Sequence, residues 1–309
     1  MPDALFAPQQ FGDTDLIRQI QLEGDTLYFR TLDSLQQVPT SGGTPQVLAD
    51  LSQEPPSEFW VTDSALLVRA TTDLFTVPKA GGAPTPLGPA LAPAPSNFAA
   101  TQLDGADLYW VAETAGSHGI FHRTLSGSTV NTVYTTKDDL VDLQLVAGTL
   151  YFMDKTAADI EGVPVAGGTP SKLTDANASD RLVAHDGANL YVTGSLGDAT
   201  STNYGLYRQP VSGKAPAHLA TGLFITIESA LDSSGAYFGA PANVSPNQVD
   251  PGDVKPSLLF AAASATATEL RWCIDSSYTL HAVAVAGNAA YISVYNTPEN
   301  KATIARVKF

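Results

Sequence analysis

The amino-acid sequence predicts an all-β protein, specifically a seven-bladed β-propeller of four-stranded antiparallel blades. Three observations lead to this prediction. A unit of about 40 residues recurs along the chain of 309 residues. Each unit contains four short segments with strand-like alternation, and Gly-Asp, Asp-Gly and Gly-Gly turns separate them. Four antiparallel strands in a unit of this length are typical of a propeller blade, and seven blades fall within the usual range.

The repeat is clearest in two stretches that share nearly every feature. Residues 22–48 read LEGDTLYFRTLDSLQQVPTSGGTPQVL, and residues 146–173 read VAGTLYFMDKTAADIEGVPVAGGTPSKL. The second residue of the Leu-Tyr pair, which lies in the second segment of each unit, marks equivalent positions. These seven markers are 39 to 54 residues apart: Tyr28, Leu67, Tyr109, Tyr151, Tyr191, Tyr237 and Tyr291.

The two ends of the chain predict how the blades close into a ring. The last unit stops at ATIARVKF, which matches the third strand of earlier units, so its fourth strand is missing. The N-terminal PDAL aligns with fourth strands such as PQVL and PSKL. Because an open ring leaves sheet edges unpaired, we expect residues 1–10 to close the last blade. The single domain of residues 1–309 then has blades at approximately 14–50, 56–90, 96–136, 138–175, 179–221, 223–273 and 277–309.

Composition limits the classes of function. The chain has 31 acidic and 16 basic residues, a net charge of −15, which argues against a nucleic-acid partner. No apolar run approaches the roughly 20 residues that span a bilayer, so we expect a protein that does not span a membrane. We also expect a monomer. The single cysteine, Cys273, excludes an intramolecular disulfide, and a buried apolar role is expected for it.

Several elements of the repeat resemble a known group of propellers. They are DGADLYW at 104–110, LYRQP at 206–210 and GGTP at 42–45. Over essentially the whole chain, the sequence is similar to bacterial exported propellers related to YWTD and NHL repeats. The resemblance implies a periplasmic or secreted location, with the signal segment absent from the given chain. Such propellers include receptors, scaffolds and lyases, so the resemblance does not define a function.

Polar residues of the predicted first strands form the candidate binding site. The first strand of each propeller blade lines the central channel, and alignment by the following turn brings three carboxylates, two arginines and a histidine to one channel mouth. Arginines there suit an anionic or carbohydrate ligand, and carboxylates suit calcium or magnesium. The alternative is that these charges pair with one another. The residues are Arg18, Glu58, Asp142, Arg181, Glu228 and His281.

Other repeated residues have a structural interpretation. A neighbouring column holds Gln21, Trp60, Gln102 and Gln144, and its repetition favours hydrogen bonding between blades. Asp and Asn beside the first turns, such as Asp186, favour Asx turns over calcium binding. The connections between second and third strands vary in length, which makes this loop-rich face a candidate for recognition. The longer connections are expected at 113–119, 194–205 and 239–256.

Two functions follow from these patterns. The favoured one is a non-enzymatic binding or scaffold module that holds a protein or glycan partner and needs no cofactor. The alternative is a cation-dependent hydrolase or lyase with a channel-bound calcium or magnesium ion held by Glu58, Asp142, Glu228 and His281. The chain has no G-x-S-x-G, Gly-rich phosphate or H-E-x-x-H motif. His118 and His122 are four residues apart, a spacing that does not align metal ligands along a strand, so no zinc site is expected.

Overall fold

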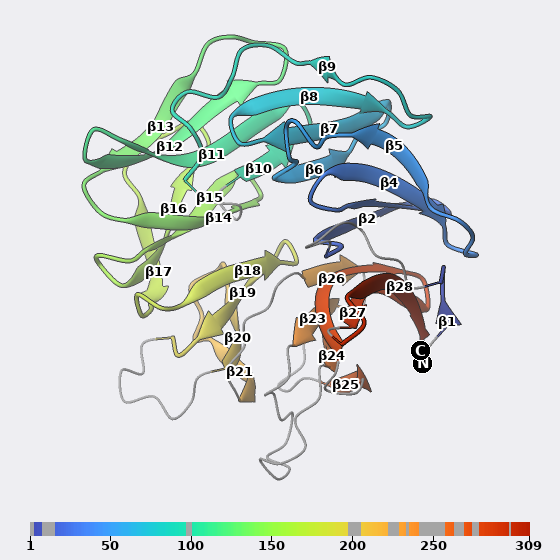
Figure 1. Ribbon diagram of the computed structural model, residues 1–309. Coiled ribbons are helices and arrows are strands. Elements are labelled where there is room, and N and C mark those ends of the chain that lie inside the picture. The colour runs from blue at the N-terminus through green and yellow to red at the C-terminus, as the bar shows by residue number, and fades with distance from the viewer. Residues whose placement is uncertain are drawn as a thin grey trace. The chain divides into compact units, whose positions relative to one another are not determined.

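The structure is a computed structural model that describes residues 3–7, 16–96, 101–196, 205–221, 229–232, 235–240, 257–262, 269–273, 278–296 and 298–309. Every regular element in these residues is a β-strand, and the strands of each sheet lie side by side (Figure 1). The β-propeller class is therefore confirmed. In the described part of the chain, no helix is long and apolar enough to span a membrane.

Six blades are built from four consecutive antiparallel strands. The first three are β2 (Gln19–Glu23), β3 (Thr26–Arg30), β4 (Ser34–Pro39) and β5 (Gln46–Asp50); β6 (Glu58–Val61), β7 (Ala65–Ala70), β8 (Asp73–Pro78) and β9 (Thr85–Pro86); and β10 (Thr101–Asp104), β11 (Asp107–Thr114), β12 (Ser117–Thr124) and β13 (Asn131–Thr136). The next three are β14 (Leu140–Val146), β15 (Thr149–Asp154), β16 (Asp159–Pro164) and β17 (Ser171–Asp175); β18 (Arg181–His185), β19 (Asn189–Gly194), β20 (Gly205–Pro210) and β21 (Ala217–Thr221); and β22 (Ser229–Asp232), β23 (Gly235–Ala240), β24 (Ser257–Ala262) and β25 (Glu269–Cys273).

The last sheet differs from these six and corrects the fold prediction. It holds the three consecutive strands β26 (Tyr278–Ala286), β27 (Ala289–Asn296) and β28 (Lys301–Lys308). Its outer position is taken by β1 (Asp3–Ala4), which is not consecutive with the other three strands and pairs with Arg306 and Ala305. Pro2 and Pro8 flank this segment in the sequence, and proline has no N–H for a ladder. The expected seven equivalent blades, closed by a strand across residues 1–10, are therefore replaced by six complete blades and this composite sheet.

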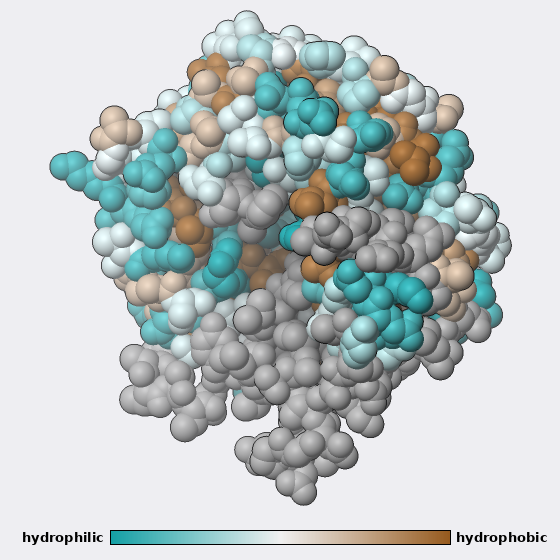
Figure 2. All heavy atoms as spheres, viewed as in Figure 1, coloured by the Kyte–Doolittle hydropathy of each residue, from teal (hydrophilic) through white to brown (hydrophobic). Residues whose placement is uncertain are grey.

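The chain divides into two compact units. One consists of Met1–Ala70, Phe75–Pro86 and Phe224–Phe309, and the other of Thr71–Leu74 and Leu87–Leu223. In the first unit, Leu5 and Phe6 pack with Ile17 and Phe29 in one apolar cluster. In the second unit, the clusters lie between neighbouring sheets and include Phe152 and Tyr207. On the face drawn in Figure 2, hydrophilic and hydrophobic areas of the described residues are interspersed.

Glutamine side chains join the first strands of neighbouring blades. The Gln21 amide nitrogen donates to the Phe59 carbonyl oxygen (2.9 Å), and the Val61 N–H donates to the Gln21 amide oxygen (2.8 Å). Gln19 makes the same kind of double contact with the Phe59 backbone, at 2.9 and 3.0 Å. The structural role predicted for Gln21 is confirmed, because these bonds satisfy backbone groups of a strand that does not pair with β2.

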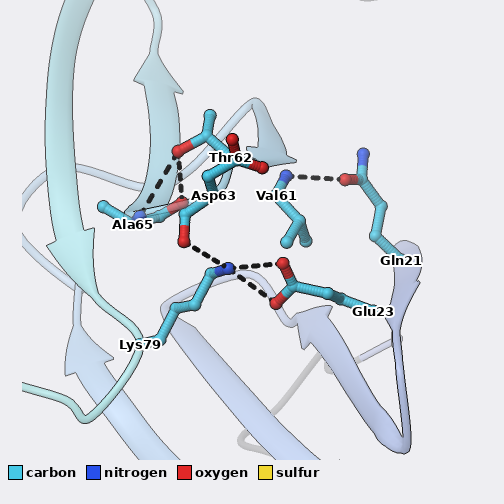
Figure 3. A network of polar contacts seen from close by, with 7 residues as sticks. All are labelled: Gln21, Glu23, Val61, Thr62, Asp63, Ala65 and Lys79. Carbon is cyan, nitrogen blue, oxygen red and sulfur yellow. Dashed lines mark hydrogen bonds and ion pairs between the residues drawn. The ribbon is translucent and has the colours of Figure 1, made fainter.

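A lysine makes a second contact between the same two blades (Figure 3). Lys79 Nζ lies 2.6 Å from each carboxylate oxygen of Glu23 and donates to the Asp63 carbonyl oxygen at 3.1 Å. Both charged groups are partly exposed, so the pair contributes less than about 1 kcal/mol. The glutamine contacts and this ion pair therefore fix β2 beside β6, which positions the candidate site described below.

The Gly-Gly turns dock on the outer strand of a neighbouring sheet. The Gly82 N–H donates to the Leu48 carbonyl oxygen at 3.0 Å, and the Gly43 N–H donates to the Leu5 carbonyl oxygen at 2.9 Å. Gly42 has φ +91°, and a Cβ there would lie 2.7 Å from the Leu5 oxygen. Two properties thus require glycine at this position: the left-handed backbone and the close approach of another chain segment.

We expect Gly42→Ala to destabilise the protein more than Gly213→Ala. Gly213 occupies the equivalent turn of another blade with φ +76°, but a Cβ there would meet nothing within 4 Å. Both variants carry the cost of a positive φ, whereas only Gly42→Ala adds a steric clash. The clash should cost about 1–3 kcal/mol more, in the range of overpacking. Urea denaturation of both variants measures this difference, and equal losses would show that the docking of the turn is unimportant.

Candidate functional site

The first strands do not all keep the register that alignment by turns assumes. In β2 and β6 the pairing is regular, with Gln19 opposite Arg30 and Glu58 opposite Arg69. The register shifts between Val141 and Gln144 in β14, between Leu182 and Ala184 in β18, and between Leu280 and Val283 in β26. These β-bulges move side chains relative to the repeat, so the alignment of polar columns is wrong in these three strands.

Four charged residues lie on or next to the strands β2, β3, β6 and β7 of the first unit. We call Arg18, Arg30, Arg69 and Glu58 the arginine cluster. Arg69 Nε and Nη2 lie 3.0 and 2.9 Å from Glu58 Oε2, while Arg30 Nη1 donates to the Pro56 carbonyl oxygen at 3.0 Å. Arg30 and Arg69 are 8% and 3% exposed. Arg18 is exposed, and its backbone N–H donates to the Arg30 carbonyl oxygen at 3.0 Å.

The arginine cluster is positively charged within an acidic chain. Its three guanidinium groups and one carboxylate give a formal charge of 3 − 1 = +2, whereas the whole chain carries −15. Glu58 accepts a hydrogen bond from Arg69. Arg30 donates to the Gln19 amide oxygen and to the Pro56 carbonyl oxygen. Arg18 is the member of the cluster that is exposed to solvent. The cluster therefore offers a guanidinium group to an anion.

His281 feels the charge of Arg18 and is a neutral group. Its Nε2 lies 2.8 Å from the Thr279 hydroxyl oxygen, and its ring meets Tyr295 edge to face. Burial lowers the pKa of His281 to about 4, and the positive charge of Arg18 adds to this effect. His281 therefore adds no charge to the cluster at neutral pH, and it is available for hydrogen bonding.

Asp142 and Arg181 form an ion pair in the second unit. Arg181 Nε and Nη2 lie 2.5 and 2.6 Å from the two carboxylate oxygens of Asp142. The Leu182 N–H also donates to this carboxylate, at 3.2 Å. Asp142 has φ +55° at the bulge of β14, a conformation that aspartate tolerates. The side chains are 1% exposed for Asp142 and 47% exposed for Arg181.

The predicted site residues thus fall into separate groups. Arg18, Glu58 and His281 belong to the first unit, and Asp142 and Arg181 pair within the second. Glu228 and the side chain of Cys273 lie outside the described residues. The alternative interpretation, in which the charges pair with one another, is observed for Glu58 with Arg69 and for Asp142 with Arg181.

Two residues of the arginine cluster were not predicted. Arg30 and Arg69 lie on second strands, whereas the site predicted from the sequence consists of residues on first strands. Both follow the marker of their unit by two residues, in TLYFR and ALLVR, so this signal is visible in the sequence. A search of the residues that pair with each first strand finds them.

The described residues also bear on the turns and loops expected from the sequence. Among the described residues, no group of three or more His, Cys, Asp and Glu side chains is placed to hold a metal ion. Asp186 accepts the Ala188 N–H in an Asx turn, as expected. The long connection expected at 113–119 is wrong, because β11 and β12 continue to a tight turn between Thr114 and Ser117. The connections at 194–205 and 239–256 lie mostly outside the described residues.

Comparison with known proteins supports the fold alone. No family model matches the chain, and no curated protein matches its sequence. A structure of oligogalacturonate lyase in complex with manganese is similar, with 10% identity and TM-score 0.65 over 92% of this chain and 86% of that one. The Pan2 WD40 domain of Neurospora crassa has 8% identity and TM-score 0.57 over 95% and 89%. A putative TolB from Agrobacterium tumefaciens has 15% identity and TM-score 0.52 over 86% and 94%.

These similarities place the chain in the β-propeller class. Propellers with similar structures include a lyase as well as WD40 and TolB proteins, so the class contains both enzymes and binding modules. None of the comparisons favours the YWTD or NHL group within this class. A function for this chain must therefore be argued from its own side chains.

Proposed function

We propose that this chain is a non-enzymatic binding module that recognises a carboxylate-bearing protein or glycan partner through the arginine cluster. The observation that carries the proposal is the exposure of Arg18, whose backbone N–H donates to the carbonyl oxygen of buried Arg30. The charge of Arg18 is felt by His281, and neutral His281 leaves that charge unopposed. An exposed guanidinium binds a carboxylate through charge-assisted hydrogen bonds.

Binding is favoured over cation-dependent catalysis because the two described candidate carboxylates are engaged. Glu58 accepts hydrogen bonds from Arg69, and Asp142 accepts them from Arg181 and Leu182. A cation at either site would have to displace a guanidinium group. His281 is in contact with Thr279 rather than with a carboxylate among the described residues. The polar residues of the first strands therefore support recognition of an anion better than coordination of a cation.

A binding assay with matched ligands tests this function. Labelled oligogalacturonate and a polyglutamate peptide represent acidic glycans and acidic protein segments, and neutral oligogalactose and a polyglutamine peptide are their controls. We expect one acidic ligand to bind and its neutral counterpart to fail. Arg18→Gln should weaken binding about tenfold, the effect of losing roughly 1.4 kcal/mol.

The control variant is Lys214→Gln, which removes the same charge from an exposed residue on another blade. It should bind like the original protein. Equal affinity for acidic and neutral ligands, or an equal effect of both substitutions, would contradict the proposed site. A glycan that is cleaved during the assay would favour the enzyme instead.

An extracytoplasmic location belongs to the same proposal. Its support is the resemblance of the repeat motifs to exported propellers. Fractionation of cells that produce the protein from its natural gene tests it. Recovery only with cytoplasmic proteins would refute this part of the proposal without affecting the binding site.

A further inference from the structure

Arg123 is a fully buried cation with unsatisfied donors. It lies on β12 and is 0% exposed. Its Nη1 donates to the Pro89 carbonyl oxygen at 2.5 Å. The other two nitrogens, Nε and Nη2, are buried and have no hydrogen-bond partner among the described residues. A buried guanidinium with unused N–H groups is unfavourable unless another group satisfies them.

The fold itself does not require an arginine here. Arg123 pairs with Leu108 in the way that Val38 pairs with Leu27 and Val163 pairs with Leu150. Both valines are buried. Valine fills this position in those blades without any polar group to satisfy, so the arginine of this blade requires a separate explanation.

Other arginines of the chain show which group the Nε and Nη2 edge of a guanidinium can bind. Arg181 uses Nε and Nη2 to hold both oxygens of the Asp142 carboxylate. Arg69 uses the same two nitrogens on the Glu58 carboxylate. In Arg123 this edge has no partner in the described part of the chain. The fork formed by Nε and Nη2 matches the two oxygens of a carboxylate.

A short exposed segment covers the guanidinium group. Residues 88–90 are exposed, and the Leu87 and Leu91 N–H groups on either side donate to the Leu74 and Thr72 carbonyl oxygens, each at 2.7 Å. A Cβ on Gly88 would lie 3.9 Å from Arg123 Nη2. The segment is thus held at both ends, and its glycine lies next to the free edge. Outward movement of three residues would expose that edge.

We propose that the Nε and Nη2 edge of Arg123 binds the carboxylate of a small organic acid, which enters when residues 88–90 move outward. The ligand is small because the guanidinium group is enclosed. The site lies in the second unit and does not involve the arginine cluster, which lies in the first. The two proposals can therefore fail independently.

Side-chain NMR of the whole chain tests this site directly. Sodium formate is added at constant ionic strength to protein labelled with nitrogen-15, and the Nε–H resonances of the arginines are followed. The resonance missing from both Arg123→Met and Arg123→Lys belongs to Arg123. We expect formate to shift this resonance downfield in a saturable way. Sodium chloride at the same ionic strength should leave it unchanged.

Three controls make the result specific. The Arg181 resonance should not move, because its edge already holds Asp142. In Arg18→Gln, the Arg123 resonance should still respond, which separates this site from the arginine cluster. Arg123→Lys keeps the positive charge in case Arg123→Met fails to fold. An Arg123 resonance that ignores formate up to molar concentration, or that responds equally to chloride, would overturn the proposal.

Discussion

Replacing Gly194 with alanine is expected to cause the largest loss of stability of any variant considered, and to prevent folding if the protein is only marginally stable. Gly194 ends β19 with φ +148°, and an added Cβ would overlap the Asp180 carboxylate. That carboxylate is fully buried and accepts the N–H groups of Asn177, Ser195 and Leu196 at 2.9, 2.9 and 3.1 Å. The added methyl must displace it.

The loss of stability depends on the polar groups that lose their partners when the Asp180 carboxylate is displaced. A buried carboxylate and three backbone N–H groups would lose their partners, and each unsatisfied group costs about 1–3 kcal/mol. The total loss is therefore on the order of 4 kcal/mol or more. Gly187→Ala is the matched control, because Gly187 lies before the same strand with φ +84° and a Cβ there meets nothing within 4 Å. Chemical denaturation compares the two variants, and losses of similar size would show that the Asp180 contacts contribute little.

We expect the loss of stability on breaking the Asp142–Arg181 pair to depend on which of the two residues is replaced. Arg181→Met leaves a buried carboxylate with the Leu182 N–H as its donor among the described residues. Asp142→Asn instead leaves a guanidinium group that is 47% exposed. Asparagine also tolerates the positive φ of residue 142. We expect losses of about 3 kcal/mol for Arg181→Met and about 1 kcal/mol for Asp142→Asn.

Urea denaturation at neutral pH measures both losses. Arg181→Lys is a useful third variant, since lysine keeps the charge but cannot form the two parallel hydrogen bonds. It should fall between the other two. A larger loss of stability for Asp142→Asn than for Arg181→Met would contradict this account. It would show that the unpaired buried carboxylate is not the main cost of breaking the pair.

The fold class could be predicted because its signals are local and repeated. Leu-Tyr segments bury their side chains on second strands, as in TLYFR of β3, and glycine turns recur between first and second strands, as at Gly24, Gly105 and Gly148. A single unit would be ambiguous, but a spacing shared by several units indicates one blade architecture. The length of β1 could not be predicted, because alignment of PDAL with other fourth strands says nothing about how far the ladder continues.

The candidate site was less predictable than the fold. A β-bulge adds one residue to a strand, and neither Val141 nor Val183 marks such an insertion by its residue type. Counting back from a turn therefore assigned Asp142 to the wrong column. Gln21 was interpreted correctly because its repetition in other blades is independent of exact register. Arg30 and Arg69 were missed because they lie on the strands that pair with the first strands.

Labelling of arginines by phenylglyoxal, followed by mass spectrometry, tests the central claim most directly. Arg18 is exposed, and Arg181 is half-exposed but paired with Asp142. With a saturating amount of the acidic ligand found in the binding assay, modification of Arg18 should slow about tenfold or more, the change expected for a group occupied most of the time. Arg181 should react at the same rate with and without ligand. An unchanged rate at Arg18 under saturation would contradict the proposal that the arginine cluster binds the partner.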